Sequence, residues 1–195
     1  MPKKPDAQLE GRILNAAYRL WERGGEQSLT MRAVAKAAGT TTPTVYQRFR
    51  DKRKLMEVMR GRALQELIAA IEPAKSAEEV CARFLKFAIA HSNLYRLLTV
   101  DWAVRLSRKE PKPSFELIKA RLAERLGGTP EEHAGLAMSL GALVHGTATM
   151  LLTSGVDEEV SRDLQRICAE GCQALIEHAE NAPSRLGRQR VGRTA

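Results

Sequence analysis

The residues best suited to binding chemistry gather between positions 30 and 52. A threonine hydroxyl can donate or accept a hydrogen bond at a base edge, glutamine can pair with adenine, and arginine can pair with guanine. Tyrosine, lysine and the free N–H groups at a helix start suit phosphate oxygens. This stretch offers such side chains at Arg32, Thr44, Tyr46, Gln47 and Lys52. Their types favour contact with double-stranded DNA.

The spacing within this stretch predicts two short helices that cross at a tight turn. Ala35 is small enough for a close crossing, and Gly39, four residues later, can take the positive φ that reverses the chain. Val45, six residues further on, can fold back onto Ala35. If Val45 and Phe49 face inward, helical geometry turns Thr44, Gln47 and Arg48 outward.

Flanking signals define the helices that must hold this turn. We expect helices over residues 8–23, 31–38, 43–49 and 51–71, because apolar residues recur there at three- and four-residue intervals. Thr30 and Asp51 stand where N-caps belong, Thr40-Thr41-Thr42-Pro43 marks a helix start, and Pro73 ends the fourth helix. A helical hairpin that never meets DNA is the plainer alternative.

The segments ILNAAYRLWERGG, LTMRAVAKAAG and TPTVYQRFRDKRKLMEVM, from Ile13 to Met59, resemble the N-terminal domain of TetR/AcrR-family regulators. Tyr46-Gln47-Arg48-Phe49-Arg50-Asp51-Lys52 matches the family's Tyr-x-x-Phe-x-x-Lys ending, whereas the Thr40-Thr41-Thr42 turn departs from the usual apolar residue after the glycine. The resemblance implies base contacts by Arg32, Thr42, Pro43 and Thr44 and phosphate contacts by Tyr46 and Lys52, with Gln47 as a further candidate. It also implies a ligand-responsive repressor that binds a palindromic operator as a homodimer.

Charge is unevenly distributed along the chain. Residues 1–72 carry 14 Lys and Arg against 8 Asp and Glu, residues 73–180 carry 13 against 15, and the tail adds four arginines without an acid. A basic first third on a near-neutral remainder is typical of a polyanion-binding domain joined to a different one. We therefore predict an all-α protein with a helix-turn-helix domain over 1–52, a connecting helix over 51–71, an effector-binding and dimerisation domain over 73–180, and a disordered basic tail over 181–195.

The second domain is predicted to contain helices at 77–91, 93–107, 114–127, 130–153 and 157–179. Residues 134–152 are apolar nearly all round and rich in glycine and alanine, so this helix should be buried. We predict that 130–153 and 157–179 from two subunits form a four-helix dimer interface. An ordinary core helix within one subunit is the alternative.

Aromatic and polarizable side chains of this domain are candidates for an effector pocket, although each of them could equally be core. Trp102 with His145-Gly146 resembles a Trp…His-Gly pattern seen in one subgroup of TetR-like C-terminal domains. The candidates are Phe84, Phe87, Tyr95, Trp102, Met138 and His145.

Other function classes fit the sequence less well. Cys168 and Cys172 share a helix face, but zinc needs about four ligands and the remaining candidates are scattered, so we expect buried apolar cysteines, no metal and no cofactor. Catalytic motifs are not found, and an architectural DNA-coating protein should be basic along its whole length. The odd number of cysteines, and the lack of about 18 consecutive apolar residues or an N-terminal signal core, predict a cytoplasmic protein without membrane contact.

Overall fold

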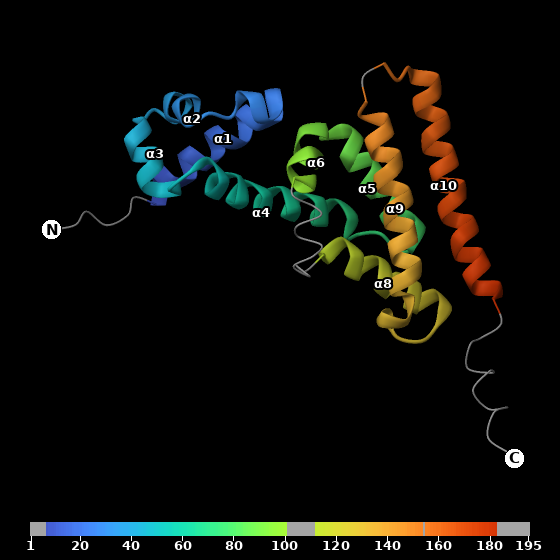
Figure 1. Cartoon of the computed structure of the whole chain (residues 1–195). Coiled ribbons are helices and arrows are strands. Elements are labelled where there is room, and N and C mark those ends of the chain that lie inside the picture. Colours follow the sequence, from blue (N-terminus) through green and yellow to red (C-terminus); the bar gives the residue numbers. More distant parts are fainter. Residues whose placement is uncertain (1–6, 101–111, 154, 183–195) are drawn as a thin grey trace, which may run out of the picture. The chain divides into compact units, whose positions relative to one another are not determined.

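The computed structural model describes residues 7–100, 112–153 and 155–182 of the chain, and these residues fold into helices joined by short turns (Figure 1). They form two compact units, which we call the head and the body. The head comprises residues up to 70 together with 86–100, and the body comprises 71–85 with the described residues from 112 onward. The predicted all-α class is confirmed.

The head is built around helix α1, Ala7–Ser28. It packs against α2 (Met31–Ala37), which in turn packs against α3 (Thr42–Phe49). The part of α4 (Lys52–Ile71) that belongs to the head meets α1 through Arg62, whose guanidinium lies over the Tyr18 ring and donates to Asn15 Oδ1. Gly24 and Gly25 are non-helical, so the regular part of α1 ends where the glycine pair predicted. The core of the head consists of fully buried apolar side chains, among them Ile13, Trp21, Leu29, Val34, Val45, Phe49, Leu55 and Met59.

A sixth helix, α6 (Ser92–Thr99), also belongs to the head. The buried indole Nε1 of Trp21 donates to the carbonyl of Asn93 at 2.5 Å, and the Asn93 amide donates to the carbonyl of Glu22 at 2.8 Å. The prediction of a helix over 93–107 was wrong in extent, because the backbone turns extended at Val100 (φ −55°, ψ 132°). Residues 101–107, including Trp102, lie outside the described residues.

The body contains α8 (Pro113–Leu126), the 3₁₀ turn η1 (Pro130–His133), α9 (Ala134–Leu151) and α10 (Glu158–Asn181), and it shares α5 (Ala77–Ala90) with the head. The two long helices α9 and α10 lie side by side as a hairpin (Figure 1). Gly171 permits their close approach, because a Cβ there would lie 3.0 Å from Leu143 Cδ2. Asp157 caps α10 by accepting from the Val160 N–H at 2.8 Å. Of the predicted disordered tail, residues 183–195 lie outside the described residues.

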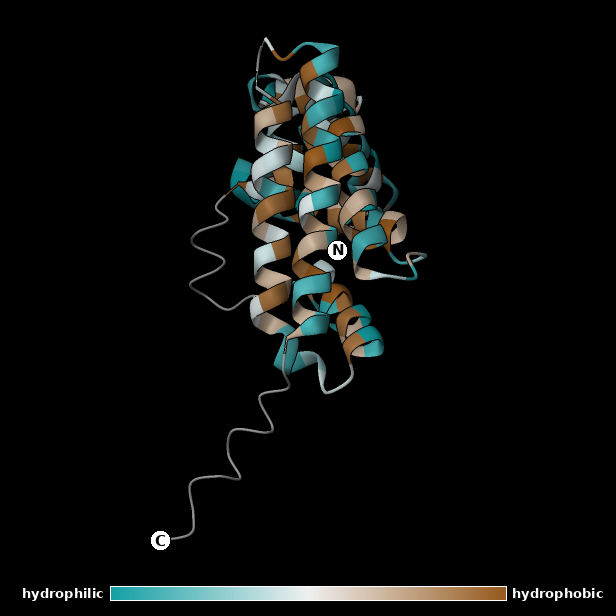
Figure 2. Ribbon diagram, turned by 90° about the vertical axis from the view of Figure 1, so that its right-hand side faces the viewer, coloured by the Kyte–Doolittle hydropathy of each residue, from teal (hydrophilic) through white to brown (hydrophobic). Residues whose placement is uncertain are grey.

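The described residues of the chain leave much of the apolar surface of the α9–α10 hairpin uncovered. Residues 130–151 are long and apolar enough to cross a membrane by length and composition, but only 28% of the 18-residue window that meets this test is buried. A single such helix is weak grounds for a membrane protein, because a buried or interface helix can have the same composition. Figure 2, in which α9 and α10 face the viewer, shows apolar residues at intervals along these two helices.

Candidate nucleic-acid interface

The turn between α2 and α3 is closed by backbone hydrogen bonds that only a left-handed residue allows. Gly39 has φ of 65°, its N–H donates to the Lys36 carbonyl at 3.3 Å, and the next N–H, of Thr40, donates to the Ala35 carbonyl at 3.0 Å. This is the Schellman arrangement, which satisfies the last carbonyls of α2. At the other end of α2, Thr30 accepts from the Ala33 N–H at 3.1 Å, as its predicted N-cap role requires.

The start of α3 is fixed by hydroxyl groups. Thr41 is the N-cap, and its Oγ1 accepts from the Thr44 N–H at 3.4 Å and lies 2.8 Å from Thr44 Oγ1. Pro43 occupies the first turn, where its missing N–H costs no hydrogen bond. The Thr44 side chain is thus held in one place by its neighbour.

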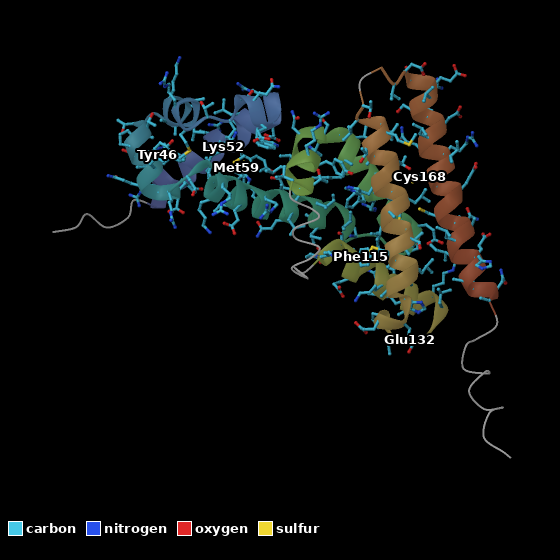
Figure 3. The ribbon with its side chains drawn as sticks, viewed as in Figure 1. Tyr46, Lys52, Met59, Phe115, Glu132 and Cys168 are labelled. Carbon is cyan, nitrogen blue, oxygen red and sulfur yellow. The ribbon has the colours of Figure 1, made fainter. Side chains whose placement is uncertain are left out.

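The outward flank of α3 carries the polar residues that the spacing predicted. Val45 and Phe49 are buried, whereas Tyr46 is 48% exposed and its neighbour Gln47 is also exposed. Figure 3 shows Tyr46 and Lys52 on the head. The remaining DNA-binding candidates are also accessible: Arg32 and Pro43 are exposed, and Thr42, Thr44 and Lys52 are partly exposed.

The start of α4 adds positive charge beside this flank. Its first turn contains Lys52, Arg53 and Lys54 and no acidic residue, although cations are disfavoured at a helix N-terminus. The Asp51 carboxylate offsets part of this unfavourable positive charge at the start of α4, where it accepts from the Lys54 N–H at 2.7 Å. The ammonium of Lys52 reaches back to α1, where Glu26 Oε1 and the Glu26 carbonyl each lie 3.4 Å away.

Arg50 is a feature of this region that the sequence did not indicate. It ends α3 with φ of 52° and ψ of −52°, and among the described non-glycine residues it alone has a positive φ. Such a conformation is costly for a residue with a Cβ. It places an exposed arginine between α3 and the cationic start of α4.

The effector candidates divide between the two units. Phe87 and Tyr95 are buried in the head, and the Phe87 ring centroid lies 4.9 Å from that of His91. Phe84, Met138 and His145 belong to the body, where Met138 is 45% exposed and burial lowers the pKa of His145. Their role as pocket residues stays a prediction.

The three cysteines are buried and unpaired by disulfides, and all three lie in the body. A hydrogen bond with Cys172, together with burial, raises the pKa of Cys168 far above its ordinary value. At Cys172 the bond from Cys168 acts in the opposite direction, but a hydrogen bond with Cys81 and burial raise its pKa to about 12. The thiols of Cys168 and Cys172 are therefore protonated near neutral pH.

Comparison with known proteins identifies the family. Residues 13–59 match the model described as "Bacterial regulatory proteins, tetR family", and residues 77–175, about half of the chain, match the "Tetracyclin repressor-like, C-terminal domain". The chain therefore belongs to the TetR family of bacterial transcriptional regulators. Such regulators are DNA-binding proteins and not enzymes, which confirms both expectations for this chain.

Solved structures of similar fold agree with this assignment. A putative TetR-family regulator from Mesorhizobium loti MAFF303099 is 18% identical over 90% of this chain and 98% of its own, with a TM-score of 0.62. The multidrug binding protein EbrR, complexed with imidazole, is 22% identical over 94% and 96%, with a TM-score of 0.61. A TetR-like regulator from Rhodococcus sp. RHA1 is 20% identical over 88% and 99%, with a TM-score of 0.57. No curated protein sequence matches the chain significantly.

Proposed function

We propose that this protein is a cytoplasmic repressor that binds a palindromic operator as a homodimer and releases it when a small molecule binds. The observation that carries the proposal is the exposed polar flank of α3, held by the Thr41 cap and the Gly39 turn beside the cationic start of α4. A helix presented in this way fits the major groove. Two such heads related by a two-fold axis read inverted half-sites about one or more helical turns apart.

The roles of individual residues follow from what each can reach. We assign base readout to Arg32, Thr42 and Thr44, with Gln47 as a further reader, because hydroxyl, guanidinium and amide groups can distinguish bases. Pro43 is assigned with them on the family resemblance, and it can make only apolar contact with a base. Tyr46 and Lys52 are assigned to phosphates, which fix the position of the head without reading sequence.

Selection of duplexes from a random pool by the purified chain tests this assignment. The enriched sequences should contain an inverted repeat.

Replacing Thr44 with Val or Arg32 with Met should change which sequences are enriched. Replacing Tyr46 with Phe or Lys52 with Met should weaken binding to all sequences, and loss of the Lys52 contact should reduce the salt slope by about one. Equal losses on every sequence for all four variants would contradict the division of roles.

The homodimer is supported by the uncovered apolar surface of α9 and α10. Exposure of so many large apolar side chains to water on one hairpin is unfavourable. A second copy of the same hairpin would cover them in a four-helix arrangement. The residues concerned are Met138, Met150, Val160, Ile167 and Leu175, which are 37–55% exposed.

An effector is supported more indirectly. EbrR is described as a multidrug binding protein, and in the present chain α6, within the stretch matched by the C-terminal family model, is bonded to α1 through Trp21 and Asn93. A ligand that favours one placement of α6 would therefore favour one placement of α1. If the head binds DNA better in one of these placements and the ligand prefers the other, ligand binding lowers the DNA affinity. Phe84, Phe87, Tyr95, Trp102, Met138 and His145 remain the proposed pocket residues.

A screen of small molecules for release of a fluorescent operator duplex tests the effector proposal. A true effector should release the duplex and raise the thermal midpoint of the free protein over the same concentration range. Operator binding that no compound in a chemically broad set alters would count against ligand responsiveness, while leaving the DNA-binding assignment intact.

A further inference from the structure

Lys52 already has an anionic partner within its own chain. Its Nζ lies 3.4 Å from Glu26 Oε1 and 3.4 Å from the Glu26 carbonyl, so one residue of α1 supplies both oxygens. The carbonyl also accepts from the Leu29 N–H at 3.2 Å, which holds it in place. Gly25, with φ of 60°, breaks the helix just before Glu26 and brings this carboxylate to the start of α4.

The other acidic groups near the start of α4 are engaged elsewhere. Asp51 accepts from the Lys54 N–H at 2.7 Å, and Glu57 accepts from the Lys54 ammonium at 2.9 Å. Glu26 therefore supplies the negative charge that Lys52 meets at this helix start, a place where anions are favoured. A DNA phosphate would satisfy the same need with the same kind of oxygen.

We infer that Glu26 is an internal competitor for Lys52: its carboxylate occupies the position of a DNA phosphate in the free protein and is exchanged for that phosphate on binding. The inference rests on the proposed phosphate role of Lys52. Glu26 then lowers DNA affinity without touching a base, so it affects all sequences alike. It limits non-specific binding by a head whose net charge would otherwise hold any duplex.

The exposure of the pair makes the exchange feasible. The side chains of Lys52 and Glu26 are 37% and 64% exposed, so water screens their attraction and DNA can reach the ammonium. Exposed pairs of this kind are weak, and removing the carboxylate should tighten binding about two- to fivefold for each head. The salt dependence of the variant should also be steeper, by up to about one: in the wild type the displaced Glu26 carboxylate takes up a cation, which offsets counterion release, and glutamine takes up none.

The experiment compares Glu26→Gln with wild type on a random-sequence duplex and on a selected operator, across a salt series. Tighter binding to both duplexes by the same factor is expected. Glu22→Gln is the matched control, since it removes the same charge from an exposed position one turn earlier in α1. The gain from Glu26→Gln should exceed that from Glu22→Gln, and the excess should vanish when Lys52 is already Met.

Three results would overturn the inference: weaker binding by Glu26→Gln, which would make Glu26 a positioning residue for Lys52; a gain no larger than that of the control; or a gain that persists without Lys52. The single variant Lys52→Met separates this failure from that of the proposed function. If it leaves DNA affinity and salt slope unchanged, the phosphate role of Lys52 is itself wrong. If it weakens binding while Glu26→Gln has no effect, only the competitor role fails.

Discussion

The head and the body both leave functional surfaces uncovered, but the two surfaces differ in chemistry and in how they are made. The α3 flank of the head is polar and is fixed by bonds over a few residues, such as the Thr41 cap and the Gly39 turn. The α9–α10 surface of the body is apolar, and the described residues of the chain leave Ile167 53% exposed there. The first surface is formed by residues of one head, whereas the second is the one that we propose a second copy of the chain covers.

The largest expected effect comes from making the body surface as polar as that of the head. Replacing both Met138 and Ile167 with Glu should give a monomer by light scattering, because paired copies would then bury carboxylates. Operator affinity should fall at least about a hundredfold, since two heads no longer bind as one unit. Binding of one head to random DNA should change little. Ala169→Glu, also exposed on α10, is the control that should stay dimeric; a dimer that survives the double replacement would refute the assigned interface.

The next test breaks the turn that makes the head surface. Gly39→Val should destabilise the protein by about 2 kcal/mol, because φ of 65° is strained for a β-branched residue, and sequence-specific binding should be lost. Gly61→Ala, in an exposed position of α4 with open space around the added Cβ, should instead stabilise by about 0.5–1 kcal/mol. Urea unfolding measures both changes, and a Gly39 variant as stable as wild type would show that the turn does not need its left-handed residue.

The same contrast explains what the sequence could predict. Thr30, Gly39 and Thr44 act through partners within a few residues, so the caps, the turn and the outward flank were predicted correctly. The pairing of Lys52 with Glu26 was missed because the two residues are 26 positions apart and meet only through the Gly24–Gly25 break. Apolar periodicity could not show that α6 ends at Thr99, and it predicted a buried α9 without showing that one chain leaves much of it exposed.

A smaller effect is expected at the junction of α1 and α6. Trp21→Phe removes the donor to the Asn93 carbonyl and leaves a small void, so it should cost about 1.5 kcal/mol. Tyr46→Phe, which also replaces an aromatic residue of the head but an exposed one, should leave stability unchanged within about 0.5 kcal/mol. If thermal unfolding shows equal losses for the two variants, the Trp21 bond does not secure this junction.

The smallest expected effect separates backbone strain from charge at the C-terminal end of α3. Arg50→Gly should stabilise the protein by about 1 kcal/mol, because glycine adopts φ of 52° without the penalty of a Cβ. It should also weaken binding to all duplexes modestly, since one exposed cation is lost near the phosphates. Arg53→Gly removes the same charge from the first turn of α4, where no positive φ is relieved and loss of an unfavourable cation offsets the cost of glycine, so it should leave stability within about 0.5 kcal/mol. A gain in stability for Arg50→Gly alone, with similar losses in DNA affinity for the two variants, would mean that the head retains a strained residue for its charge. A destabilising Arg50→Gly would mean that the arginine side chain holds the turn itself.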